Sequence, residues 1–280
     1  MTPPPPLLSY SAVLMPFDGS PQSVGTFPLA WTIARAMEGS LHLVLSGEQT
    51  GIRDRLPLLA EGGSEAILHE LLGDLATGIV HLAAFTPGTF IVTPSYSGAR
   101  PESGLGAFQE ELLCRAECPV LLVQPGMAWT AWTPKRILVP QDGSAEAARA
   151  LCPAARLAEH TGAEMLILHV SSDCPTAPPR PGALEFPAYV DRPHHEWPSW
   201  VACFLERVRH LCSLSTLTEL RFQWAHGDPA REIVAVARQK KADLVTMSWH
   251  RSVEPGRSQV VRQVVRDSPC PILILPGIPC

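Results

Sequence analysis

The feature that most constrains this chain is a phrase that occurs in it twice. An apolar pair, a proline, one further residue and Asp-Gly-Ser form "LMPFDGS" at 14–20 and "LVPQDGS" at 138–144. Two more landmarks recur in the same order, namely Gly-Asp before a helical pattern and Cys-Pro before an apolar run. They begin at Gly73 and Gly227, and at Cys118 and Cys270. Three shared landmarks in one order indicate a module that has been copied once.

The second copy is longer than the first between its first two landmarks. The additional part contains a proline-rich stretch from Cys174, which predicts loop because proline fixes φ and lacks a donor, and a helical pattern at 200–212. The predicted organisation is a proline-rich tail at 1–9, a first domain at 10–126 that is shortened between its second and third strands, a linker at 127–134, and a second domain at 135–280 with an insertion at about 171–199.

Strand and helix patterns alternate through the second copy. The expected strands are 136–140, 164–170, 221–226, 243–247 and 272–275, and the expected helices are 145–161, 200–212, 230–241 and 260–266. The short continuous apolar runs favour strands that are covered on both faces. Such alternation predicts a parallel, doubly wound sheet with right-handed crossovers, whose ligands bind beyond the carboxyl ends of the strands.

The Asp-Gly-Ser phrase is expected where the first strand of each copy ends and its first helix begins. The carboxylates of Asp18 and Asp142 can accept hydrogen bonds from ribose hydroxyls or from the amino group of a base, and Gly19 and Gly143 permit a turn there. Aspartate and serine are also favoured caps at any strand-to-helix turn. The residues therefore leave two interpretations open, a nucleotide contact and a purely structural turn.

Three segments of the second half, 138–170, 226–248 and 261–276, resemble the universal stress protein family in its tandem, two-domain (UspA-like) form. The first half is similar through "AVLMPFDGS", "LLGDLATGIVHLAA" and "CRAECPVLLVQP". The resemblance implies an α/β fold of two tandem, doubly wound domains with five parallel strands each. These domains would be Rossmann-like, similar to the adenine nucleotide alpha hydrolases, and related by a pseudo-twofold axis.

The resemblance also implies that the domains pair through their last strands. The runs "PVLLVQP" and "PILILP" would be bare apolar edges in isolated domains, and such edges need a partner. The chain itself is the expected partner, either as an intrachain pseudo-dimer or as a homodimer.

Nucleotide-binding members of the family carry a glycine motif after the fourth strand: Gly, two residues, Gly, nine residues, Gly, then Ser or Thr. Backbone N–H groups of such a loop cradle phosphates, and glycine permits their close approach. The second copy departs from this motif, with Ser248 and Arg251 at the first two glycine positions and Ser258 at the closing one. Gly256 lies nearby but out of register.

The first copy is closer to the motif. It offers Gly98, Gly104 and Gly106, with Ala107 in place of the closing hydroxyl residue. By the resemblance, Val170 at the end of the second strand would line an adenine pocket in the second domain.

The expected function is that of a binding or regulatory module of the stress response, without catalytic residues and with at most weak ATP hydrolysis. ATP or another adenine nucleotide is the expected ligand, with no metal beyond the Mg²⁺ that accompanies it. The alternative is a protein-interaction scaffold that needs no nucleotide. An adenylating enzyme is the least favoured, because its "SGGxDS" or "HxGH" signature is absent. The adjacent His194 and His195 lie in the proline-rich insertion and have no evident third metal ligand.

Composition and charge limit the kinds of partner and the cellular location that we expect for this chain. The net charge is −5 and no lysine or arginine run is present, which argues against nucleic acid. No apolar stretch is long enough to cross a membrane, and no secretory signal is evident, so a cytoplasmic location is expected. The eight cysteines are scattered through apolar segments, which favours buried, reduced thiols over disulfides.

Overall fold

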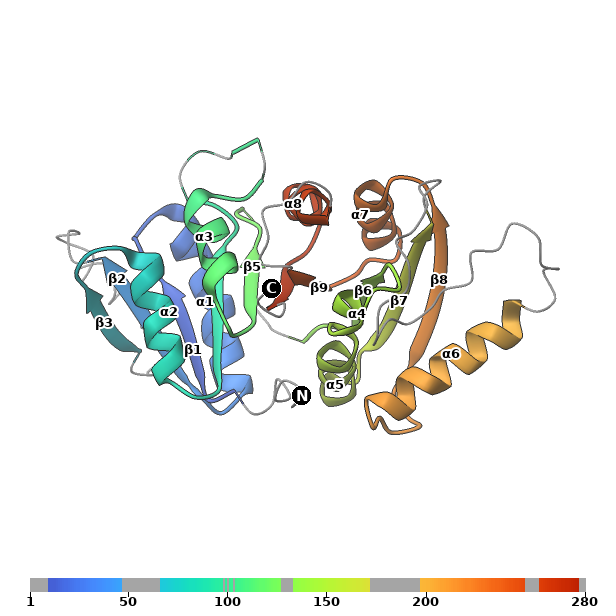
Figure 1. Cartoon of the computed structure of the whole chain (residues 1–280). Helices are drawn as coiled ribbons and strands as arrows, with labels where there is room; N and C mark the ends of the chain where they lie inside the picture. Colours follow the sequence, from blue (N-terminus) through green and yellow to red (C-terminus); the bar gives the residue numbers. More distant parts are fainter. Residues whose placement is uncertain are drawn as a thin grey trace.

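The computed structural model describes residues 10–46, 66–97, 99, 101, 102, 104–126, 133–171, 197–249 and 257–276. Two α/β lobes lie side by side and share one ten-stranded sheet (Figure 1). The expected sites at Gly98, Gly256, Arg251 and the His194–His195 pair lie outside the described residues. Within the described ranges, no helix combines the length and the apolar character needed to cross a bilayer.

The two halves of the sheet have the same topology. In the first half the order is β3-β2-β1-β4-β5, and in the second, read from its outer edge, it is β8-β7-β6-β9-β10. All pairs within each half are parallel. The strands are β1 (Ala12–Pro16), β2 (Ser40–Ser46), β3 (Ile67–Leu71), β4 (Thr89–Pro94), β5 (Val120–Val123), β6 (Arg136–Gln141), β7 (Glu164–Ser171), β8 (Leu220–His226), β9 (Leu244–Trp249) and β10 (Ile272–Pro276). The repeat in the sequence is thus a repeat of the fold, and the predicted doubly wound α/β architecture is confirmed.

The seam between the halves is the antiparallel pair of β5 and β10. Leu121 lies opposite Leu273 in this pair, and both side chains are completely buried. These two leucines occupy the same position relative to the Cys-Pro landmarks at Cys118 and Cys270. The pseudo-twofold axis therefore passes between Leu121 and Leu273. The first half of the sheet continues into the second through the strands that would otherwise be bare edges.

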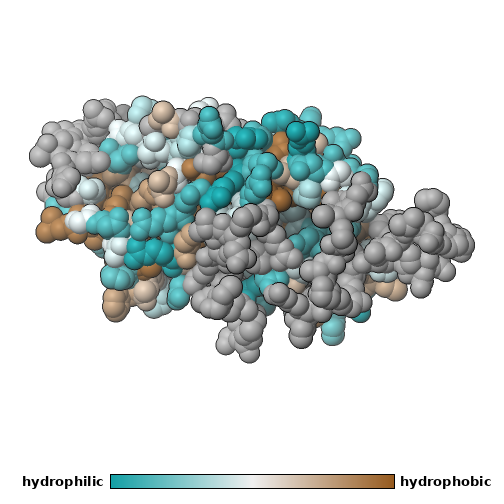
Figure 2. Space-filling view, turned by 45° about the horizontal axis from the view of Figure 1, so that its top comes forward, coloured by the Kyte–Doolittle hydropathy of each residue, from teal (hydrophilic) through white to brown (hydrophobic). Residues whose placement is uncertain are grey.

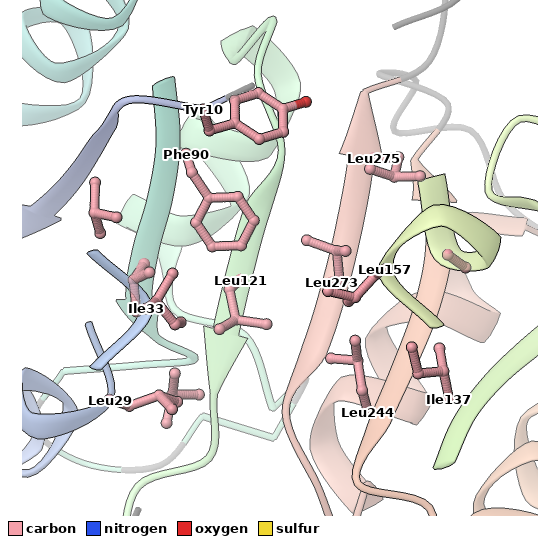
Figure 3. Packing of buried hydrophobic residues seen from close by; sticks show 14 of the residues in the cluster. Tyr10, Leu29, Ile33, Phe90, Leu121, Ile137, Leu157, Leu244, Leu273 and Leu275 are labelled. Atoms are coloured by element: carbon pink, nitrogen blue, oxygen red, sulfur yellow. The ribbon is translucent and has the colours of Figure 1, made fainter. Parts of the chain in front are cut away.

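Helices cover both faces of the sheet. One face carries α1 (Pro21–Ala36), α4 (Ala145–Ala148), α5 (Leu151–Thr161) and α6 (Trp197–Leu211) over one apolar cluster. The other face carries α2 (Leu75–Phe85), α3 (Ala107–Arg115), α7 (Pro229–Gln239) and α8 (Arg257–Asp267) over a second cluster. The first cluster runs across the seam, where Leu121 and Phe90 of one domain face Leu273 of the other (Figure 3). The two domains consequently share one core.

The single helix expected over 145–161 is wrong in one respect, because it is two helices. Arg149 and Ala150 form a turn between α4 and α5. Pro153 explains the break, since it has no N–H for the carbonyl of Arg149 and its ring crowds that carbonyl in a continuous helix. In the first turn of α5, by contrast, a proline leaves no helical hydrogen bond unmade.

The expectation of reduced thiols is wrong for one pair of cysteines. Cys152 of α5 and Cys212, directly after α6, form a disulfide across a sequence separation of 60 residues, with their Cα atoms 4.9 Å apart. Packing of α6 against α5 brings the two together, and sequence spacing carries no sign of that contact. Among the other described cysteines, Cys114, Cys118, Cys203 and Cys270 are free thiols.

Candidate ligand site at the carboxyl ends of the strands

In the first domain the Asp-Gly-Ser phrase forms a tight, capped turn between β1 and α1. The backbone N–H of Ser20 donates to Asp18 Oδ1 at 2.9 Å, and Gly19 takes a left-handed φ of 70°. Ser20 is the N-cap of α1, and its Oγ accepts the N–H of Ser23 at 3.2 Å. Only glycine adopts such a φ without strain, so each residue of the phrase has a structural task.

The second domain repeats this turn between β6 and α4. The N–H of Ser144 donates to Asp142 Oδ1 at 2.9 Å, Gly143 has a φ of 81°, and Ser144 Oγ accepts the N–H of Ala147 at 3.1 Å. The Asp-Gly-Ser sequence therefore occurs twice because it forms the same capped turn in both domains.

The two aspartates differ in their surroundings. Asp18 is half-buried, whereas Asp142 is exposed. Burial acts to raise the pKa of the Asp18 carboxyl, but hydrogen bonds from Ser20 and Ser23 outweigh it and hold this pKa below its usual range. Asp142 is the more accessible of the two to a ligand.

Gly104 of the first domain lies at the contact with the second domain. It has a φ of 74°, and a Cβ added to it would lie 2.3 Å from the Cα of Arg266 in α8. Gly106 is the N-cap of α3 and makes no side-chain cap, and its added Cβ would meet Oε1 of Gln109, on a flexible side chain of the same helix, at 2.3 Å. Glycine at position 104 is thus required for packing against the second domain, independently of any phosphate.

The motif positions of the second domain that are described carry side chains. Ser248 is the penultimate residue of β9, and Ser258 at the start of α8 is buried. Between these positions, Trp249 ends β9 with only 1% of its surface exposed, and its Nε1 has no hydrogen-bond partner. The register of the strands places Ser95 of the first domain at the equivalent position. A buried indole therefore occupies the end of β9, directly after Ser248.

Val170 lies on β7, half-buried, opposite Ala225 of β8. Both pack against the cluster beneath α7 and α8. This wall is apolar, as an adenine pocket would require.

Two polar residues beneath the turn between β6 and α4 were not foreseen from the sequence. Gln141 and Thr246 are 3% and 0% exposed, and Gln141 Oε1 and Thr246 Oγ1 have no hydrogen-bond partner. They come from the adjacent strands β6 and β9, and alternation along each strand turns both toward the α4–α5 face. The equivalent residues of the first domain are the apolar Phe17 and Val92. Position-by-position comparison of the two copies would have found this difference.

Histidines line the same end of the second domain. His169 Nδ1 lies 2.9 Å from the carbonyl oxygen of Gln141. Burial lowers the pKa of His169, and the Gln141 carbonyl and the Asp142 charge oppose that effect only in part. Next to it, Ser171 Oγ and His226 Nδ1 are 3.1 Å apart on the exposed surface. Nucleophilic catalysis by such a pair would also require a group that orients the base, and donors to an oxyanion.

The described ranges contain no metal-binding geometry. No group of three or more His, Cys, Asp or Glu side chains there could hold a metal ion. The candidate ligand contacts at this end of the second domain are the exposed Asp142 carboxylate and the apolar wall of Val170 and Ala225, whereas Gln141 and Thr246 are buried on the opposite face of the sheet.

Comparison with known proteins agrees with the topology. The family model of the universal stress protein family matches residues 133–191 and 216–276. No curated protein sequence matches the chain significantly.

Solved structures match the chain over nearly its whole length. The universal stress protein of Archaeoglobus fulgidus DSM 4304 is 20% identical, with a TM-score of 0.68 over 96% of this chain and 98% of that one. A protein of unknown function from Pseudomonas aeruginosa PAO1 is 15% identical, with a TM-score of 0.62 over 97% and 94%. At these identities the likeness establishes the fold and nothing finer. The second half of this chain thus matches the model of the universal stress protein family, and the whole chain shares the fold of the solved universal stress protein.

Proposed function

We propose that the chain is a regulatory binding module of the stress response, without enzymatic activity, and that its second domain binds an adenine nucleoside or monophosphate in preference to ATP. The observation that carries this proposal is Trp249, whose buried ring ends β9 where a phosphate cradle would begin. Ser248 and Ser258 add Cβ atoms at two positions where a cradle needs glycine. Side chains at these positions disfavour a triphosphate, and a ligand with little or no phosphate does not need a glycine cradle.

The other groups at the site suit the remaining parts of such a ligand. The exposed Asp142 carboxylate can accept hydrogen bonds from ribose hydroxyls, and Val170 and Ala225 offer an apolar wall to a base. Gln141 and Thr246 are buried on the opposite face of the sheet, beneath α4 and α5, and take no part in this contact.

Thermal unfolding with adenosine, AMP and ATP tests the proposal. We expect adenosine and AMP at millimolar concentration to raise the melting temperature by about 2–4 °C, and ATP to raise it by no more. Asp142→Ala should abolish the shift. Asp18→Ala is the matched control, because it removes the same residue from the other turn, and it should retain the shift.

Two outcomes contradict the proposal. A larger shift with ATP than with AMP would show that a polyphosphate is accommodated. Absence of any shift with all three ligands would favour the second candidate function, an interaction scaffold that needs no nucleotide.

The scaffold is supported by the outer edge of the first domain. Ile67 and Leu68 of β3 are 45% and 39% exposed, and Phe85 at the end of α2 is 86% exposed. Hydrophobic surface is visible at this end of the molecule in Figure 2. An exposed apolar edge strand is typical of surfaces that add a strand from another chain. A scaffold would bind a protein partner with unchanged affinity when adenosine is added.

A further inference from the structure

We propose that Cys152 and Cys212 are a redox-sensitive thiol pair, and that their disulfide fastens α6 to the second domain. The pair joins α5 to the residue that follows α6. Cys212 is 3% exposed, while Cys152 is partly exposed and so can be reached by a small reagent. This inference does not depend on what the ligand site binds.

The disulfide acts on the element that most distinguishes the second domain. Helix α6 lies on the outside of the molecule, across β8 (Figure 1), and the described part of the first domain has no such helix. Phe204, Val208 and Cys212 recur every four residues and are all buried, so they form one apolar stripe. Cys212 is the last member of this stripe, and the disulfide therefore secures the end of the docked face.

The rest of the docking is aromatic. The rings of Trp200 and Phe204 lie 5.2 Å apart, and each lies 5.5 Å from Phe222 of β8 in an edge-on arrangement. Helix α6 contacts the body of the domain on this single face. When the disulfide is absent, the apolar stripe, the aromatic contacts with Phe222 and the hydrogen bond from the Ser215 N–H to Glu159 Oε1 of α5 must hold α6 against the entropy gained on undocking. Reduction should therefore shift α6 toward an undocked state while the sheet stays folded.

Formation of the bond from a small disulfide, such as glutathione disulfide, balances without any cofactor. The Cys152 thiolate attacks one sulfur of the reagent, forms a mixed disulfide and releases one thiolate. The Cys212 thiolate then attacks Cys152 Sγ, forms the intramolecular bond and releases the second thiolate. The two cysteine protons go to solvent or to the released thiolates, so two protein thiols become one disulfide and one reagent disulfide becomes two thiols.

The chain contains its own control. Cys203 is exposed on the same helix and is a free thiol, so it can react with the reagent but is not part of the pair. Cys203→Ser removes a thiol from α6 and leaves the Cys152–Cys212 disulfide intact.

Hydrogen exchange of the full-length protein in oxidised and reduced glutathione buffers tests the inference, together with peptide mapping of the disulfide under non-reducing conditions. We expect a Cys152–Cys212 linked peptide in the oxidised sample, and exchange of the 197–211 amides about tenfold faster after reduction. Amides of β6 and β9 should be unaffected. Cys212→Ser should exchange at the fast rate in both buffers, and Cys203→Ser should behave like the wild type.

The wild-type comparison needs no variant, so it remains decisive if Cys212→Ser folds poorly. Two results overturn the inference. One is that Cys152 and Cys212 stay free in oxidised glutathione while Cys203 is modified. The other is that the linked peptide forms but the exchange of α6 is the same in both buffers.

Discussion

The two domains share a strand order and a capped Asp-Gly-Ser turn, yet they differ at the ends of their central strands. The first domain has Phe17 and Val92 beneath its turn, whereas the second has the buried Gln141 and Thr246, each with an unpaired side-chain oxygen. The second domain alone has the disulfide-anchored helix α6 among the described residues. Its site and its outer helix are thus the more specialised parts of the molecule.

In the first domain, the loop at 104–106 and its neighbours contact α8 of the second domain. Gly104 packs against Arg266 of α8, and the side chain of Gln124 donates to the carbonyl of Val265 at 2.6 Å. Ser95 Oγ in turn donates to Gln124 Oε1 at 3.3 Å. Gly104 and Gln124 thus contact the second domain directly, and Ser95 orients Gln124. In the first domain these residues support the seam between the two domains.

The largest expected effect comes from breaking the seam at Gly104. In Gly104→Ala, the new Cβ would collide with the backbone of α8, and the left-handed φ would be strained as well. Together these costs lower the free energy of unfolding by about 3 kcal/mol. Gly126→Ala is the matched control, because Gly126 also has a positive φ, of 87°, but its Cβ would meet nothing within 4 Å. It should cost only about 1 kcal/mol.

Urea denaturation of the two variants measures this difference. Equal costs would mean that backbone conformation alone makes Gly104 necessary, and that the loop does not support the seam.

A second, smaller effect concerns the ion pair across the seam. Arg262 Nε lies 2.8 Å from Glu110 Oε1, and both side chains are largely buried. The two residues stand at equivalent positions of the two copies, counted from Cys118 and Cys270. In a dimer of identical domains, the residue at this position would face the identical residue of the partner across the twofold axis, and the two like charges would repel each other. The opposite charges are therefore possible only because the two copies have diverged.

Charge reversal tests that divergence. Glu110→Arg should lower the free energy of unfolding by about 1–2 kcal/mol, because it places two guanidinium groups together, and adding Arg262→Glu should restore most of the loss. Glu111→Arg is the control on the same helix, since Glu111 pairs within α3 with Arg115 and is more exposed. Glu111→Arg should lower the free energy of unfolding by a few tenths of a kcal/mol, and adding Arg262→Glu should not restore this loss. Failure of the double variant to recover would show that the pair does not select the partner domain.

Much of the fold could be predicted because short-range patterns in the sequence determine it. Repeated landmarks gave the duplication, apolar runs gave the strands, and the two bare apolar edges suggested the seam. The break at Arg149 could have been found as well, since Pro153 was visible in the sequence.

Other features depend on tertiary contacts that no local pattern encodes. Cys152 and Cys212 meet only after α6 has docked, and Gly104 is needed only because α8 arrives from the other domain. A glycine-rich loop looks the same in sequence whether it approaches a phosphate or a helix. For this reason the sequence could not show that Gly104 packs against α8 of the other domain.

The smallest expected effect separates the two Asp-Gly-Ser turns by pH. Asp18 is half-buried and has a lowered pKa, so its ionised form stabilises the fold. A depressed pKa contributes stability that is complete above the unfolded value, about 3.9, and is lost as the pH falls through the folded value. At pH 7, Asp18→Ala should cost about 1 kcal/mol, and the exposed Asp142→Ala about half of that.

Urea denaturation of both variants between pH 7 and pH 3 distinguishes the turns. The difference between wild type and Asp18→Ala should shrink as the pH approaches 3, because the carboxyl then becomes protonated in the folded protein and loses its charge-assisted hydrogen bonds. A cost for Asp142→Ala that equals the cost for Asp18→Ala at pH 7 would mean that burial does not distinguish the turns. The Asp142 carboxylate would then stabilise its own turn as strongly as the Asp18 carboxylate does, and it would be less available to a ligand.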